Sequence, residues 1–142
     1  MLFEKNKDIY EYFVCPRCYY TMDKCTCDIE AYPNYCAVMI DKGVQEQIRI
    51  LNSKNYFTLY CCESHDAKDT IYIKFRDKFG LGKNIDIPSG FELDKNNNQI
   101  EYHYDKNMKQ EDFEKTKEKQ LSILLDWCKS LPECKKHELF IR

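Results

Sequence analysis

Four cysteines stand within thirteen residues near the start of this chain, in the stretch CPRCYYTMDKCTC. Cys15 and Cys18 form a Cys-x2-Cys knuckle, a loop that lets two sulfurs converge on one point. Cys25 and Cys27 are two residues apart, so on an extended segment their thiols point to the same side. Four thiolates complete the tetrahedral shell of a structural zinc site. We therefore expect one zinc ion, held by these four cysteines.

The spacing differs from that of a standard zinc ribbon, in which a longer segment separates two Cys-x2-Cys knuckles. Cys36, in YPNYC, is therefore a substitute for Cys25 or Cys27 as a ligand. Other interpretations of the cluster stay open. An iron–sulfur cluster suits the same soft ligands. A redox-active dithiol fits less well, because no strand-then-helix pattern surrounds the motif, and the thiols could also simply be buried.

Two Cys-x2-His pairs form a second constellation, Cys62 with His65 and Cys134 with His137. They predict a second zinc site only if the fold brings the two pairs together. Cys62 activated by His65 would also suit a nucleophilic enzyme, which needs the pair within hydrogen-bond reach and a third group to orient the imidazole. The competing interpretation is that such cysteines are small core residues, as expected for Cys128 on the apolar stripe of a helix.

Composition and motifs narrow the function classes. There is no phosphate-binding glycine loop, serine nucleophile elbow or recognisable carboxylate pair, so no catalytic residue is assigned and a non-catalytic role is favoured. The net charge of −2 and pI near 5.9 argue against nucleic-acid binding through bulk positive charge. The N-terminus lacks a signal peptide pattern and no apolar run is long enough to span a membrane, so we expect a cytoplasmic protein. Nine cysteines in a reducing compartment favour metal binding over disulfides.

The order of the strands and helices expected from the sequence predicts an α+β fold. We expect a mostly antiparallel sheet with two helices on one face, which must position the cysteines and histidines. We expect a small N-terminal zinc-knuckle or ribbon module over residues 1–36 and an α+β domain over residues 37–142. CAVMI, beginning at Cys36, reads as a short buried strand. The helix that follows begins at Asp41 as N-cap, and its buried face is formed by Val44, Ile48 and Leu51.

Three or four further strands and a long helix complete the pattern. YFTLYCC places Phe57, Leu59 and Cys61 on one face of a strand, and TIYIKFR alternates cleanly, with Ile71, Ile73 and Phe75 facing inward. FELDKNNNQIEYHY reads as a hairpin that turns around three asparagines and leaves His103 exposed. The long helix runs from residue 110 to residue 130 and ends before Pro132, and HELFIR is a candidate terminal strand. The helix should bury Leu121, Leu124, Leu125 and Cys128.

The motifs CPRC, LNSKNYFTLYCCESH, IYIKF and IPSGF, over residues 15–93, resemble small uncharacterised zinc-ribbon-containing proteins of low-GC bacteria and their phages. This resemblance implies metal binding and an origin in a mobile element. The CTC half departs from a standard ribbon, which leaves the fourth ligand open.

The sequence therefore leads to three functional hypotheses. The first is a zinc-stabilised interaction or regulatory protein that binds another protein, such as a phage or mobile-element accessory or inhibitor protein, because aromatic side chains suit an interface. The alternative is an RNA- or single-stranded-DNA-binding module that stacks bases on an aromatic strand. The third is a Cys/His or metal-dependent enzyme that uses the Cys62–His65 region.

Overall fold

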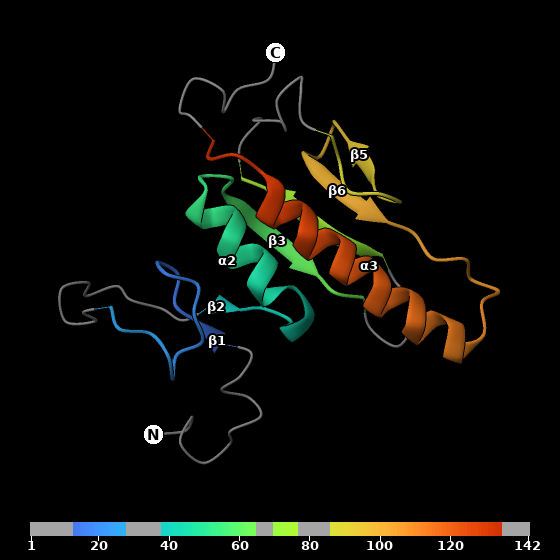
Figure 1. The fold of residues 1–142 in the computed structure, drawn as a ribbon, viewed down its shortest axis with the longest axis horizontal. Coiled ribbons are helices and arrows are strands. Elements are labelled where there is room, and N and C mark those ends of the chain that lie inside the picture. The colour runs from blue at the N-terminus through green and yellow to red at the C-terminus, as the bar shows by residue number, and fades with distance from the viewer. Residues whose placement is uncertain (1–12, 28–37, 65–69, 77–85, 135–142) are drawn as a thin grey trace.

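The computed structural model describes residues 13–27, 38–64, 70–76 and 86–134. Two layers are visible in Figure 1, where α2 and α3 lie side by side over the same face of a sheet. In chain order the elements are β1 (Phe13–Val14), β2 (Val38–Met39), the 3-10 helix η3 (Lys42–Val44), α2 (Gln45–Ser53), β3 (Thr58–Cys62), β4 (Ile71–Phe75), β5 (Glu92–Asp94), β6 (Gln99–Tyr102) and α3 (Gln110–Ser130).

The main sheet has four strands in the order β3-β4-β6-β5, and every neighbouring pair is antiparallel. A separate two-stranded sheet joins β1 to β2. The predicted α+β class, with a mostly antiparallel sheet and two helices, is confirmed. The hairpin is also confirmed, since β5 and β6 pair around the asparagine-containing turn.

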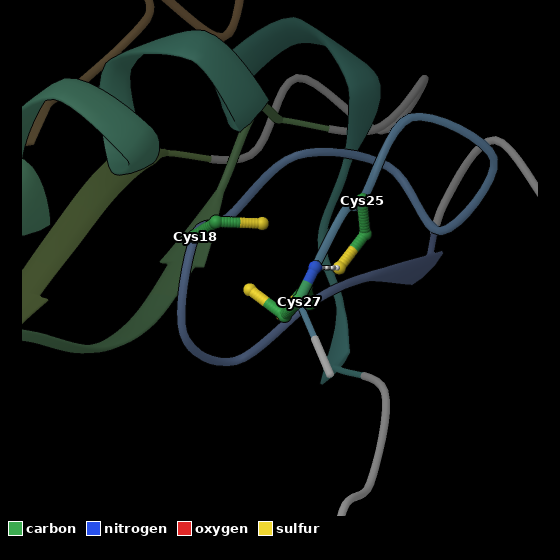
Figure 2. A group of neighbouring side chains, drawn as sticks. Cys18, Cys25 and Cys27 are labelled. Atoms are coloured by element: carbon green, nitrogen blue, oxygen red, sulfur yellow. Dashed lines mark hydrogen bonds between the residues drawn. The ribbon is translucent and has the colours of Figure 1, made fainter. Parts of the chain in front are cut away.

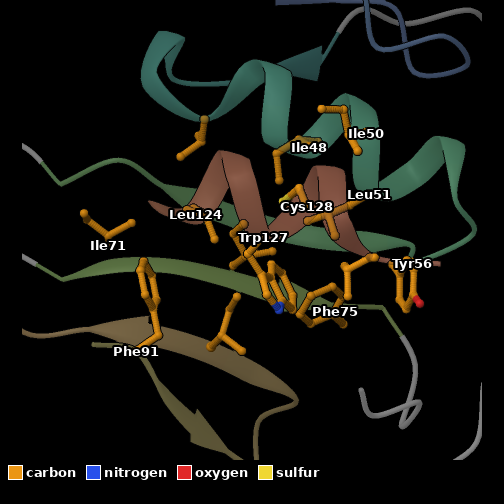
Figure 3. Packing of buried hydrophobic residues seen from close by; sticks show 14 of the residues in the cluster. Ile48, Ile50, Leu51, Tyr56, Ile71, Phe75, Phe91, Leu124, Trp127 and Cys128 are labelled. Carbon is orange, nitrogen blue, oxygen red and sulfur yellow. The ribbon is translucent and has the colours of Figure 1, made fainter. Parts of the chain in front are cut away.

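The core lies between the helices and the sheet (Figure 3). Every second residue of β4 enters it, because successive side chains of a strand point to opposite faces. Ile71 and Ile73 are fully buried and Phe75 nearly so, as the alternation predicts. Leu124 and Cys128 of α3 reach the same core from the helix layer. The remaining members of the predicted helical stripe, Leu121 and Leu125, are partly buried against it.

Two predictions about the segment before α2 are wrong. The described part of CAVMI, residues 38–40, does not form a buried strand: Val38 is 41% exposed and Met39 is 64% exposed, and of these three residues only Ile40 enters the core. The side chain of Asp41 makes no capping hydrogen bond to the helix that follows it. Its Oδ2 instead accepts a hydrogen bond from the backbone N–H of Glu63 (3.2 Å). A contact with a residue distant in sequence has replaced the local cap.

The single face predicted for Phe57, Leu59 and Cys61 is interrupted in β3. The pairing of β3 with β4 shifts register between Thr58 and Tyr60, which places a β-bulge at Leu59. A bulge puts two residues opposite one, so the alternation of faces is interrupted there. Leu59 is 48% exposed and Tyr60 is 63% exposed, whereas Cys61 packs against the core.

The C-terminal end of α3 is held by the segment that follows α2. Lys54 Nζ donates hydrogen bonds to three backbone carbonyl oxygens, those of Cys128 (2.9 Å), Lys129 (2.8 Å) and Leu131 (2.7 Å). These are carbonyls that a helix C-terminus leaves without an intrahelical partner. The two helices are therefore joined by a cation that lies at the negative end of one helix dipole.

The cysteine-rich segment and the rest of the chain share backbone pairing. Phe13 pairs with Met39 and Val14 with Val38, across the predicted boundary at residue 36. Val14 is 1% exposed and belongs to the main core cluster. The division into two domains stays a prediction, because residues 28–37 lie outside the described residues, as does the predicted terminal strand in HELFIR.

Candidate metal centre

The first half of the metal centre is a tight backbone loop that begins where β1 ends. The Cys15 N–H donates to the carbonyl of Tyr20 (2.9 Å), and the Tyr19 N–H donates to the carbonyl of Cys15 (2.8 Å). These bonds fold the chain back so that Cys18 approaches Cys15. Tyr19 has a φ of 60°, the left-handed conformation that side-chain-bearing residues rarely adopt. The loop thus requires a strained residue, which the sequence motif does not reveal.

The second half is positioned by a turn. Val14 forms an antiparallel bridge with Thr21, which aligns the returning chain with β1. The carbonyl of Thr21 then accepts hydrogen bonds from the N–H groups of Lys24 (2.9 Å) and Cys25 (3.0 Å). This turn directs Cys25 and Cys27 toward the knuckle.

All four predicted ligand atoms come together. The sulfurs of Cys15, Cys18, Cys25 and Cys27 lie within 4.8 Å of one another, and Figure 2 shows three of them directed at a common space. In a tetrahedral site with metal–sulfur bonds of about 2.3 Å, sulfurs are about 3.8 Å apart. The observed group needs a contraction of about 1 Å or less to reach that geometry. These four cysteines could hold a metal ion, and the fourth place does not require Cys36, which lies outside the described residues.

Backbone amides support two of the sulfurs. The Arg17 N–H lies 3.4 Å from Cys15 Sγ, and the Cys27 N–H lies 3.3 Å from Cys25 Sγ (dashed in Figure 2). Such donors stabilise negative charge on sulfur.

The thiols by themselves resist ionisation. Desolvation is the main cause of the raised pKa of Cys18. Desolvation, followed by hydrogen bonds with the neighbouring thiols, raises the pKa of Cys27 to about 12. A bound divalent cation reverses this preference, because a coordinating thiol is deprotonated. The donor set therefore fits a cation that accepts soft ligands.

The knuckle is attached to the rest of the molecule by buried and aromatic contacts. Val14 and Cys15 are 1% and 0% exposed, and Tyr19 packs against the main core. The Arg49 guanidinium carbon lies 4.8 Å from the centroid of the Tyr20 ring, a cation–π distance. The metal centre is thus held against α2 as well as against β2.

The second predicted zinc site does not form between Cys62 and Cys134. The Cys134 N–H donates to the carbonyl of Lys54 (2.7 Å), just after the C-terminal end of α2. Cys62 is next to Glu63, whose N–H bonds Asp41 ahead of the N-terminal end of that helix. A nine-residue helix is about 13 Å long, so no single ion reaches both sulfurs. The two histidines proposed for this site, His65 and His137, lie outside the described residues.

Two of the other cysteines, Cys61 and Cys128, are not activated thiols, and His65, the predicted partner of the candidate nucleophile Cys62, lies outside the described residues. The Cys62 sulfur accepts a hydrogen bond from the Ser64 N–H (3.4 Å). Desolvation raises the pKa of both Cys61 and Cys128 to about 12. Thiols whose pKa is raised by burial are unreactive core residues, as predicted for Cys128 from its place on the apolar stripe of the helix.

His103 is exposed, as predicted, and takes part in a hydrogen-bonded row that the sequence did not reveal. Its Nε2 lies 3.0 Å from Glu101 Oε1, and its Nδ1 lies 3.2 Å from Thr70 Oγ1. The side chain of His103 is 54% exposed, and water competes for such contacts. The row is a surface network and supplies no buried reaction centre.

The structure contains no helix, within the described residues, that is long and apolar enough to cross a membrane. Comparison with known proteins found no matching family model, no matching curated protein and no matching solved structure. The function of this chain must therefore be inferred from its own residues.

Proposed function

We propose that this chain is a zinc-stabilised module that binds another protein. Zinc is the metal best suited to the centre. Four thiolates fill its tetrahedral coordination shell and leave no open position, and the zinc ion itself undergoes no redox change. A closed site has a structural role, which is to hold the knuckle in place against α2 and β2.

The observation that supports protein binding is the distribution of exposed apolar side chains. Among the described residues, every large hydrophobic side chain that is at least 41% exposed comes from the cysteine-rich loop, β2 or β3. We call this set the docking surface: Tyr20 (47% exposed), Val38 (41%), Met39 (64%), Leu59 (48%) and Tyr60 (63%). Exposed large apolar side chains are candidates for an interaction site, and Tyr and Met are common in interfaces.

Tyr19 lies between the loop that bears Tyr20 and the main core. This side chain packs against the core, as does Cys61 of β3. Desolvation raises the pKa of Tyr19, and Arg76 and Cys61 also influence it electrostatically, which places it near β3. The knuckle therefore adjoins the strand that bears Leu59 and Tyr60.

The shape of β3 favours a partner that docks through side chains. β3 is an edge strand, and its bulge at Leu59 interrupts the regular ladder. Bulges on edge strands discourage the addition of another strand. Leu59 is exposed at the bulge, and Tyr60 faces outward opposite Lys74, so both side chains are available to a partner.

A pull-down from the native host tests this proposal, with the zinc-loaded protein as bait. Leu59→Arg should abolish capture of the partner, because a charge would be buried within the docking surface. Ser122→Arg is the matched control, because Ser122 is exposed on α3 away from that surface and should leave capture unchanged. Capture of no specific protein, or equal capture by both variants, would contradict the proposal.

Single-stranded nucleic acid is the second candidate partner. It is favoured by aromatic–cation pairs on the sheet face opposite the helices. Tyr60 lies across from Lys74 in the ladder, and the Arg76 guanidinium carbon is 4.5 Å from the centroid of the Phe57 ring. Such pairs can stack bases and contact phosphates.

Acidic residues make nucleic acid the weaker candidate. Glu101 pairs with Tyr72 on one side and with Glu92 on the other, so carboxylates occupy the β5–β6 half of the same face. Titration of labelled oligo-U RNA and oligo-dT at two salt concentrations tests the idea. Absence of salt-dependent binding at micromolar protein would reject it.

The resemblance to zinc-ribbon-containing proteins of low-GC bacteria and phages extends the proposal. The partner would then be a host protein, and the chain an accessory or inhibitor protein of a mobile element.

A further inference from the structure

The docking surface has one part that depends on the cysteine cluster and one part that does not. Tyr20 is the second residue after Cys18, and its carbonyl is bonded to the Cys15 N–H (2.9 Å). Val38 and Met39 are held by β1, which leads directly into Cys15.

The other part belongs to the main sheet. Tyr60 pairs with Lys74 of β4 in a ladder that continues to Cys62, and Leu59 is the bulged residue beside it. The bonds that fix these two side chains include none from the knuckle among the described residues. Loss of the metal would therefore remove three of the five docking residues and leave two.

We infer that the four-cysteine cluster is an oxidation site that controls assembly of this docking surface, an inference that rests on the proposed function. Three of the four cysteines, Cys18, Cys25 and Cys27, are partly exposed, so a small oxidant can reach the cluster from solvent. All four sulfurs lie within 4.8 Å of one another, so each has a partner for a disulfide nearby.

The oxidant is a peroxide, and the step is balanced. Two thiolates of the cluster each give up one electron, and a sulfur–sulfur bond forms between them. The oxygen–oxygen bond of one hydrogen peroxide molecule breaks, and two protons from water convert its oxygens into two water molecules. A second peroxide oxidises the second pair of thiolates in the same way. The cation then has no thiolate ligands and leaves, and a dithiol reductant with zinc reverses the change.

Oxidation also uncovers apolar surface. Val14 and Cys15 are at most 1% exposed, and Tyr19 covers part of the core. When the disulfides form within each half of the cluster, Cys15 with Cys18 and Cys25 with Cys27, no bond at the cluster joins the two halves any longer. The loop between them, which includes Tyr19 at its strained φ of 60°, then gains conformational freedom. In the oxidised form, Tyr20 and β2 are therefore no longer ordered and do not contribute to the docking surface.

Hydrogen exchange measured by mass spectrometry tests the inference without any partner. The full-length zinc-loaded protein is compared with samples treated with chelator, with hydrogen peroxide, and with peroxide followed by dithiothreitol and zinc. In the chelated and oxidised samples, exchange should accelerate by about tenfold or more in residues 13–27 and 38–39. Residues 58–62 and 71–75 should change by less than about twofold. A zinc-sensitive dye should report about one ion released per two peroxide molecules consumed.

Two variants make the outcome specific to the cluster. Cys62→Ser removes a partly exposed thiol of β3 and should leave zinc release unchanged. Cys18→Ser should show fast exchange in residues 13–27 before any oxidant is added. The inference is overturned if zinc stays bound in excess peroxide, if residues 38–39 remain protected, or if protection is lost over the whole sheet. None of these results depends on the pull-down, so failure of the switch and failure of protein binding are distinguishable.

Discussion

Lys54 is a polar side chain whose removal should weaken the attachment of α2 to the C-terminal end of α3. It is partly buried between the end of α2 and the end of α3. Its ammonium group donates to the carbonyls of Cys128, Lys129 and Leu131 at 2.7 to 2.9 Å. Lys54→Met keeps most of the apolar stem and removes the charge and all three donors.

The magnitude follows from the environment of the three acceptors. The bonds to Cys128 and Leu131 are partly buried, and each should contribute about 1 kcal/mol after solvation is counted. The bond to Lys129 is exposed, so water replaces it at little cost. Loss of the cation at the helix C-terminus costs about 0.5 kcal/mol. The free energy of unfolding should therefore fall by about 2–3 kcal/mol.

Urea unfolding of the zinc-loaded protein, followed by circular dichroism, measures this change. Lys129→Met is the matched control, since Lys129 is an exposed lysine in the same last turn of α3 and should change stability by less than about 0.5 kcal/mol. The reasoning is refuted if Lys54→Met is as stable as this control. An unchanged denaturant slope would show that the loss occurs in the folded state.

Three further predictions concern the metal, a close backbone approach and alkaline pH. Metal analysis should find one zinc ion per chain. Cys18→Ser should abolish zinc binding and unfold the cysteine-rich loop, because structural zinc contributes on the order of 10 kcal/mol to folding of its own module. Zinc binding that persists in Cys18→Ser would contradict the ligand set. Gly43→Ala should destabilise by about 1 kcal/mol, because the added methyl displaces the flexible Glu63 carboxylate, which accepts a hydrogen bond from the Gly43 N–H. A thermal melt unchanged from wild type would argue against it. Burial raises the folded pKa of the Cys128 thiol from 9.0 to about 12, so the stability it adds is present below pH 9 and is lost as pH rises toward 12. Between pH 9 and 12, the free energy of unfolding should fall less steeply with pH in Cys128→Ala than in wild type, and the two slopes should differ by up to about 1.4 kcal/mol per pH unit. Equal pH slopes, measured by urea unfolding at several pH values, would show that the Cys128 thiol does not have the raised pKa.

Patterns that repeat locally could be read from the sequence. The alternation around Ile73 placed β4 correctly, because one buried face of a strand imposes a period of two. The apolar stripe and the proline after it placed α3. The spacing of Cys15, Cys18, Cys25 and Cys27 sufficed to predict a cluster, because a short loop cannot separate its own residues by much.

Contacts between distant parts of the chain could not be read in this way. Asp41 bonds the backbone of Glu63 and makes no cap, and Lys54 bonds carbonyls more than seventy residues away. The bulge at Leu59 depends on how β3 registers with β4. Neither residue type nor spacing encodes these choices, because each is decided by the geometry of the partner segment.

The sequence by itself therefore determined the class of the fold and the set of thiols, since both depend on residues close together along the chain. Only the tertiary structure decided that Cys62 and Cys134 lie at opposite ends of α2. It also decided which apolar residues of the cysteine-rich loop, β2 and β3 remain exposed. The physical reason is that burial depends on which surfaces cover one another, and that is settled only when helices, sheet and knuckle pack together.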